Sequence, residues 1–67
     1  MSVAKVMEIS SRSPESFEQA IRTGLERAAK TVQGIKGAWV KEQKVEFDGK
    51  GITNYVVHMK VTFELRE

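Results

Sequence analysis

The residue types best suited to chemistry gather in one short segment. Trp39 offers a flat aromatic surface, Lys44 an ammonium group, and Glu42, Glu46 and Asp48 carboxylates. Carboxylate oxygens are the ligands that hard cations such as Ca²⁺ and Mg²⁺ prefer, and in a regular strand Glu42 and Glu46 share a face because side chains alternate with period two. We expect a candidate metal site at Glu42 and Glu46, with an ordinary solvated strand as the alternative.

Five side chains each allow two interpretations. Trp39 is either a platform for a planar ligand or a ring that packs between subunits. Lys44, Lys60 and Arg66 could contact the phosphates of a nucleotide-like ligand, or serve solubility. His58 is either an exposed polar side chain or a titrating group at an interface.

The residue types present in the chain argue against catalysis. The chain has one histidine and no cysteine, so neither a Ser-His-Asp arrangement nor a thiolate nucleophile can be built from it. The glycines at positions 49 and 51 belong to an Asp-Gly-Lys-Gly hairpin signal rather than to a phosphate-binding loop. We expect a protein that is not an enzyme.

Size and charge narrow the class of protein. The 67 residues form a single domain, residues 1–67, and a chain this short buries only about 60% of the surface that it exposes when unfolded. Without disulfides, self-association is the common way to stabilise so small a core. The net charge of +2 comes from interleaved signs, and no apolar run is long enough to span a membrane. We therefore expect self-association, no nucleic-acid or membrane partner, and a cytoplasmic location.

One helix must organise the core. Apolar residues recur at helical spacing between Ser13 and Gly34, and no strand produces that stripe. Ser13 is the expected cap, Pro14 suits the first turn, and Gly34 ends the element. Gly24 lies on the stripe, which predicts a close approach of helix to sheet.

The remaining segments are typical of strands. We expect them at Ser2–Ile9, Ala38–Phe47 and Ile52–Glu67. Residues 10–13 read as a polar turn, Gly34 and Gly37 as the limits of a tight reversal, and residues 48–51 as a hairpin turn.

The middle strand has an irregular pattern of apolar residues. Val40 points one way, and Trp39, Val45 and Phe47 point the other way. A β-bulge near Gln43–Val45 would reconcile the two phases; coverage of both faces by neighbouring subunits is the alternative. The expected fold is α+β, a β-α-β-β chain whose three-stranded antiparallel sheet packs on one helix through the odd-numbered face of the last strand.

The sequence resembles the dodecins over essentially its whole length. The matching pieces are KVMEIS leading to SPESFEQAI, then GLERA, VKEQ and ITNYVVHMKVTFEL. The resemblance implies a hollow homododecamer that stores or buffers a small ligand. The family default is a flavin, riboflavin or FMN, and some members also bind coenzyme A.

Two departures from the dodecin pattern bear on that ligand. Gly37 stands where flavin-binding dodecins have a ring-stacking tryptophan, and Val56 stands where they have a flavin-bonding glutamine. Glu42 and Lys44 do match an acidic and a basic position of the family. By resemblance the ligand-binding positions are Gly37, Trp39, Glu42 and Lys44. The expected function is a weakened form of flavin sequestration; the alternative is a flavin-free shell that acts as a scaffold or binds Ca²⁺ or Mg²⁺.

Overall fold

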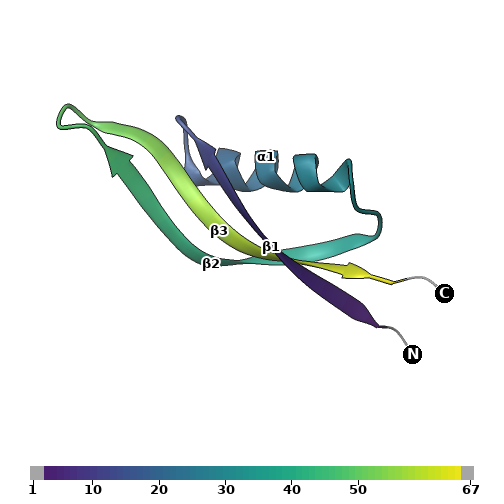
Figure 1. Cartoon of the computed structure of the whole chain (residues 1–67). Coiled ribbons are helices and arrows are strands. Elements are labelled where there is room, and N and C mark those ends of the chain that lie inside the picture. The colour runs from purple at the N-terminus through teal and green to yellow at the C-terminus, as the bar shows by residue number, and fades with distance from the viewer. Residues whose placement is uncertain (1–2, 66–67) are drawn as a thin grey trace.

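A computed structural model describes residues 3–65 as three strands and one helix (Figure 1). The elements follow the order β-α-β-β, and their bounds are β1 Ala4–Ser13, α1 Phe17–Ala29, β2 Ile35–Phe47 and β3 Ile52–Glu64. The expected α+β fold, with an antiparallel sheet packed on one helix, is confirmed. Of the strand ends expected from the sequence, Ser2, Arg66 and Glu67 lie outside the described residues.

The sheet has the order β1-β3-β2, with both pairings antiparallel, so β3 is the central strand. Helix α1 lies along one side of the sheet and packs on β1 and β3 (Figure 1). The other side carries the even-numbered residues of β3 and their neighbours on β1 and β2. We call it the open face.

The core forms where the helix stripe meets the odd-numbered side of β3. Ala20, Val57 and Met59 are fully buried there. The residues packed around them are Ile9, Phe17, Ile21 and Leu25. The Phe17 ring also meets the Tyr55 ring edge to face, with centroids 5.1 Å apart. The predicted core is confirmed.

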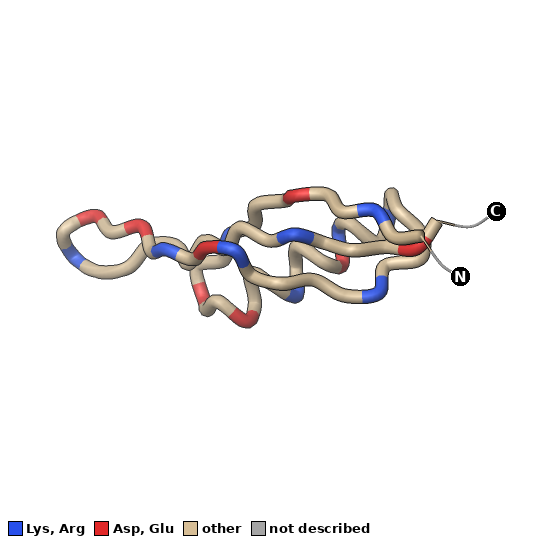
Figure 2. The backbone as a smooth tube through the Cα atoms, turned by 90° about the horizontal axis from the view of Figure 1, so that it is seen from below, with Lys and Arg blue, Asp and Glu red and all other residues tan. Residues whose placement is uncertain are grey.

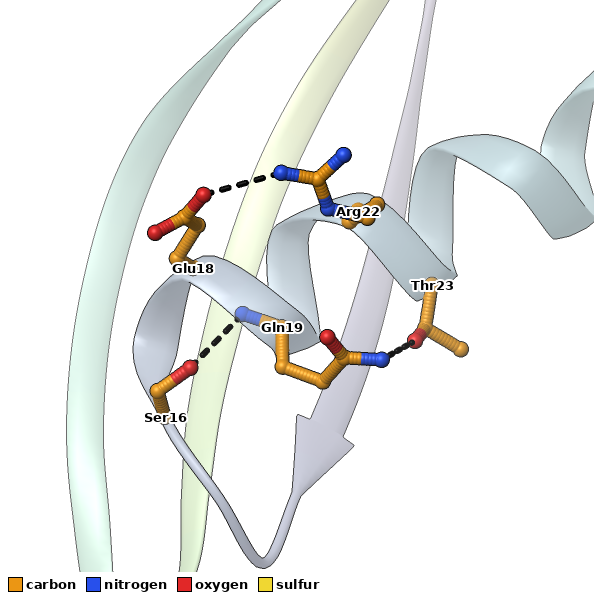
Figure 3. A network of polar contacts seen from close by, with 5 residues as sticks. All are labelled: Ser16, Glu18, Gln19, Arg22 and Thr23. Atoms are coloured by element: carbon orange, nitrogen blue, oxygen red, sulfur yellow. Dashed lines mark hydrogen bonds and ion pairs between the residues drawn. The ribbon is translucent and has the colours of Figure 1, made fainter.

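The helix is shorter than expected at both ends. Its cap is Ser16 and not Ser13: the Ser16 hydroxyl accepts from the Gln19 amide at 2.9 Å (Figure 3). Ser13 is the last residue of β1, where its buried hydroxyl accepts from the amide of Glu15 at 3.0 Å. At the other end the helix stops at Ala29, and Gly34 serves the loop before β2 with a φ of +81°.

The first two strands are longer than expected. Residues 10–13 continue β1 rather than forming a turn, because they pair with residues 55–58 of β3. Gly37 lies inside β2, whose first residue is Ile35. The hairpin turn is confirmed: Asp48 Oδ1 accepts from the amide of Lys50 at 2.9 Å, and Gly49 has a φ of +93°.

The expected β-bulge exists, but it lies at Lys41 instead of Gln43–Val45. The pairing with β3 skips this residue, passing from Val40 opposite Met59 to Glu42 opposite His58. Val40 and Val45 therefore share the helix side of the sheet, while Trp39 lies on the open face. The grouping of Val45 with Trp39 was wrong, because one extra residue exchanges the two faces.

The molecule is elongated, with extents of 51 × 20 × 13 Å. The β2–β3 hairpin projects beyond the start of α1, and the start of β1 and the end of β3 lie at the opposite end of the sheet (Figure 1). Within residues 3–65, no helix is both long and apolar enough to cross a membrane. Basic and acidic residues are interspersed along the backbone (Figure 2).

Candidate functional site on the open face

Cross-strand pairing arranges the open face in rows, each with one residue from β1, β3 and β2. Directly opposed side chains on neighbouring strands have Cβ atoms about 5 Å apart. From the hairpin end toward the chain ends, the rows are Arg12-Val56-Lys44, Ser10-His58-Glu42, Glu8-Lys60-Trp39 and Val6-Thr62-Gly37. The bulge at Lys41 brings Glu42 and Trp39 into successive rows.

A groove of about 540 Å³ lies over the first two of these rows. Its lining comes from all three strands: Ser10, Glu42, Gln43, Lys44, Val56 and His58. Glu42 and Lys44, two of the four positions expected to bind ligand, therefore lie together in one groove. Trp39 and Gly37 do not line it and occupy the next two rows of the same face.

A carboxylate beside the groove holds its histidine. The Nε2 atom of His58 lies 2.6 Å from Glu8 Oε1, and Lys41 Nζ lies 3.8 Å from the same oxygen. The hydrogen bond from His58, then the charge of Lys41, lower the pKa of Glu8 below its usual 4.5. Glu8 is thus ionised at neutral pH, and Lys41, the bulge residue, reaches it from the far strand.

Trp39 is covered on one side within its own chain. The ammonium group of Lys60 lies 5.8 Å from the centroid of the ring, in cation–π range. The side chain is nevertheless 51% exposed. In the next row, a Cβ built on Gly37 would meet only Thr62 Oγ1, at 3.9 Å, which is ordinary van der Waals contact. The backbone there has room for a Cβ atom.

The two residues of the expected metal site share the open face but not one ion. They are four positions apart on a stretch of β2 that pairs regularly with β3, which separates their Cα atoms by roughly 14 Å. Glu46 is also 3.5 Å from Arg12, across the sheet. Within residues 3–65, no group of three or more His, Cys, Asp or Glu side chains could hold a metal ion.

Two of the lining residues, Ser10 and His58, were not among the positions expected to bind ligand. Ser10 was expected in a turn, and His58 either as an exposed polar side chain or as a titrating group at an interface. Period-two alternation along β3 places His58 beside Val56 and Lys60, and extending β1 past Ile9 would have added Ser10. Of the basic residues considered for phosphate contacts, Lys44 lines the groove, Lys60 covers Trp39, and Arg66 lies outside the described residues.

Taken together, these features define a class of protein: a small β-α-β-β chain with a polar, grooved sheet face left uncovered by its single helix. The chain belongs to the dodecin family, whose model matches residues 3–66. Among known proteins it is similar to the calcium dodecin of Mycobacterium tuberculosis, with 39% identity over 98% of this chain and 93% of the relative.

Solved dodecins have the same fold. The dodecin from Streptomyces davaonensis superposes with a TM-score of 0.94 at 35% identity, over 98% of this chain and 97% of the other. The tt0972 protein from Thermus thermophilus superposes with a TM-score of 0.94 at 34% identity, over 100% of this chain and 98% of the other. The crystal structure of the calcium dodecin superposes with a TM-score of 0.83 at 38% identity, over 96% of this chain and 91% of the other. That structure is described as having a novel calcium-binding site. Dodecins are small ligand-binding proteins and not enzymes, as the sequence led us to expect.

Proposed function

We propose that this chain self-assembles as a dodecin shell, a hollow homododecamer, and that the shell binds a divalent cation, Ca²⁺ or Mg²⁺. The observation that carries the proposal is the placement of Glu42 and Glu46 on the open face, too far apart to share an ion within one chain. Such carboxylates become a cation site when symmetry brings copies together. The similarity to a calcium dodecin supports the same ligand class.

The cation proposal is tested by metal content and thermal stability. Native mass spectrometry of the purified protein should give twelve subunits, and elemental analysis should detect Ca²⁺ or Mg²⁺. A ligand at 100 times its Kd adds about 2.7 kcal/mol of stability to the state that binds it. We therefore expect EDTA to lower the Tm and added Ca²⁺ to restore it.

Matched variants then locate the cation site. Glu42→Gln and Glu46→Gln should each reduce the Ca²⁺-dependent rise in Tm. Glu18→Gln, on the exposed face of α1 where Glu18 pairs with Arg22 at 2.9 Å (Figure 3), should leave it unchanged. If the dodecamer forms but its Tm changes with neither EDTA nor Ca²⁺, the cation proposal is wrong and the shell acts as a scaffold.

A second candidate is storage of a planar ligand such as riboflavin, FMN or coenzyme A. The groove of about 540 Å³ favours it, since Glu42 and Lys44 could orient polar groups there and Trp39 could offer its ring from the next row. Against flavin stand Gly37, which has no ring, and Val56, which is 6% exposed and apolar. We expect the protein to leave riboflavin and FMN fluorescence unquenched at micromolar concentration.

The flavin alternative also has a gain-of-function test. The double variant Gly37→Trp, Val56→Gln returns the two side chains that the family uses, and a Cβ at position 37 would meet only Thr62 Oγ1, at 3.9 Å. Quenching by the double variant but not by the natural chain would attribute the lost flavin binding to these two positions. Quenching by the natural chain would instead make flavin its ligand.

A further inference from the structure

The row Ser10-His58-Glu42 differs from the other rows of the open face because it contains the single imidazole of the chain. The sequence has a single histidine and no cysteine, so any imidazole coordination must come from His58. Ca²⁺ and Mg²⁺ take oxygen ligands, whereas imidazole suits ions such as Zn²⁺. A site at His58 would therefore favour a different ion from the carboxylate site proposed above, with Glu42 common to both.

Glu8 fixes which ring nitrogen is available. An ionised carboxylate can only accept hydrogen bonds, so at 2.6 Å from Glu8 Oε1 the Nε2 atom of His58 must carry the proton. The neutral ring then keeps its lone pair on Nδ1. Among the described residues no side chain hydrogen-bonds Nδ1. A carboxylate behind one ring nitrogen is the arrangement that orients most metal-ligating histidines.

The neighbours of His58 in its row supply what an ion at Nδ1 needs. Glu42 stands directly opposite on β2 and Ser10 directly opposite on β1, and all three line the groove. The Glu42 carboxylate could supply a second ligand, and the Ser10 hydroxyl could hydrogen-bond a water on the ion. Open coordination positions remain for water or for a group from another copy.

From this geometry we propose that His58 Nδ1 and the Glu42 carboxylate bind a borderline divalent ion such as Zn²⁺, with Glu8 as a positioning residue behind the imidazole. Lys41 Nζ lies 3.8 Å from Glu8 Oε1 and pairs with that carboxylate from β2. Lys44 lines the same groove and opposes the ion by its charge.

The first test is calorimetric titration of the assembled protein with ZnCl₂ at neutral pH. We expect a site that His58→Gln weakens by at least tenfold and Glu8→Gln by about tenfold, the usual range for a second-shell partner. Lys44→Gln should strengthen binding, and Glu18→Gln on the helix should leave it unchanged. Retention of the natural affinity by His58→Gln, or absence of Zn²⁺ binding by the natural chain, would overturn the proposal.

A spectroscopic test separates a metal ligand from a merely structural histidine. In long-range ¹H–¹⁵N NMR, Zn²⁺ should shift the Nδ1 signal while Nε2 remains protonated, and a single histidine leaves no ambiguity of assignment. A shift at Nε2, or at neither nitrogen, would contradict the geometry. His58→Gln should leave the Ca²⁺-dependent Tm unchanged, so the two proposals can fail independently.

Discussion

At the scale of single residues, the open face depends most on Glu8. This half-exposed carboxylate accepts from His58 on the central strand and lies near Lys41 from the outer strand, so one side chain links all three strands of the sheet. Its pKa is lowered chiefly by the hydrogen bond from His58 and next by the charge of Lys41. A carboxyl group with a lowered pKa stabilises the folded state only while it is ionised.

We expect this contribution to be lost in acid. Above pH 4.5, the usual pKa of the carboxyl group, the contribution of Glu8 is present; it disappears as the pH falls from there through the lower folded-state value. The Tm of the variant Glu8→Gln should therefore decline less steeply over that range than the Tm of the natural chain. Thermal melts between pH 3 and pH 7 measure both profiles. Identical acid profiles for both proteins would show that Glu8 gains no net stability from its partners.

At the scale of elements, α1 depends on its first turn and on its closest contact with the sheet. Ser16 caps the helix, and Glu18 pairs with Arg22 one turn further on (Figure 3). The glycine on the stripe allows the helix to sit close to β1 and β3. A Cβ at Gly24 would lie 2.9 Å from Ser11 Cβ and 3.0 Å from Met59 Cε, so the close approach expected from the sequence is confirmed.

Removal of the cap should be measurable on its own. Ser16→Ala leaves the Gln19 amide without its side-chain acceptor, and we expect a loss of about 1 kcal/mol in the free energy of unfolding. Thr23→Ala is the control, because Thr23 is exposed and its Oγ1 accepts only one long hydrogen bond, from Gln19 Nε2 at 3.4 Å. Urea titrations at a fixed protein concentration measure both. Equal stability of the two variants would show that the Ser16 hydroxyl does not stabilise the helix as its cap.

Substitution at Gly24 sets two effects against each other. Gly24→Ala improves helix propensity by about 1 kcal/mol, but its methyl group meets the Ser11 Cβ, which is fixed to the strand. Overpacking of this kind costs about 1–3 kcal/mol, and we expect a net loss of stability in the same titrations. Gly51→Ala, where an added Cβ meets nothing within 4 Å, should be nearly neutral. A Gly24→Ala variant as stable as the natural chain would show that β1 can move away from the added methyl group at little cost in free energy.

The sequence predicted the elements well and their limits poorly, for identifiable reasons. The order of elements, the helix stripe and the hairpin at Asp48 depend on local patterns, which a single chain displays directly. Residues 10–13 look like a turn because they are polar, and only their pairing with β3 makes them a strand. The bulge was expected on the right strand, but its position follows from the cross-strand register, to which residues from both strands contribute.

The candidate site was predictable only in part for the same reason. Glu42 and Lys44 could be singled out by type and spacing on one strand. Their grouping with Ser10 and His58 depends on three strands from different parts of the chain, and the link from Lys41 to Glu8 depends on the bulge. Local sequence carries no signal for such combinations.

At the scale of the whole molecule, the chain is long, thin and incompletely covered. Helix α1 covers β1 and β3, while several apolar side chains of β2 and the hairpin remain largely exposed. They include Trp39, Val40, Val45, Phe47 and Ile52. Exposed apolar surface on this scale is typical of subunit contacts, which agrees with the proposed homododecamer.

The role of Trp39 can be decided by assembly. We expect Trp39→Ala to shift the protein toward smaller species, because a half-exposed ring of this size contributes mainly by packing between copies. Size-exclusion chromatography with light scattering, over a range of concentrations, measures the shift, and Lys60→Gln controls for loss of the cation–π contact alone. An intact dodecamer in Trp39→Ala would instead favour the ring as a ligand platform.

The extra residue in β2 also limits which changes of length the chain can tolerate. Deleting Lys41 would remove this one irregularity, but every residue from Ile35 to Val40 would then move to the other face of the sheet. Trp39 would face the helix, and Val40 the surface that carries the groove. A deletion at this point would therefore exchange the faces of six residues at once, whereas a substitution changes one side chain. We therefore expect the length of β2 to be inherited more strictly than its composition.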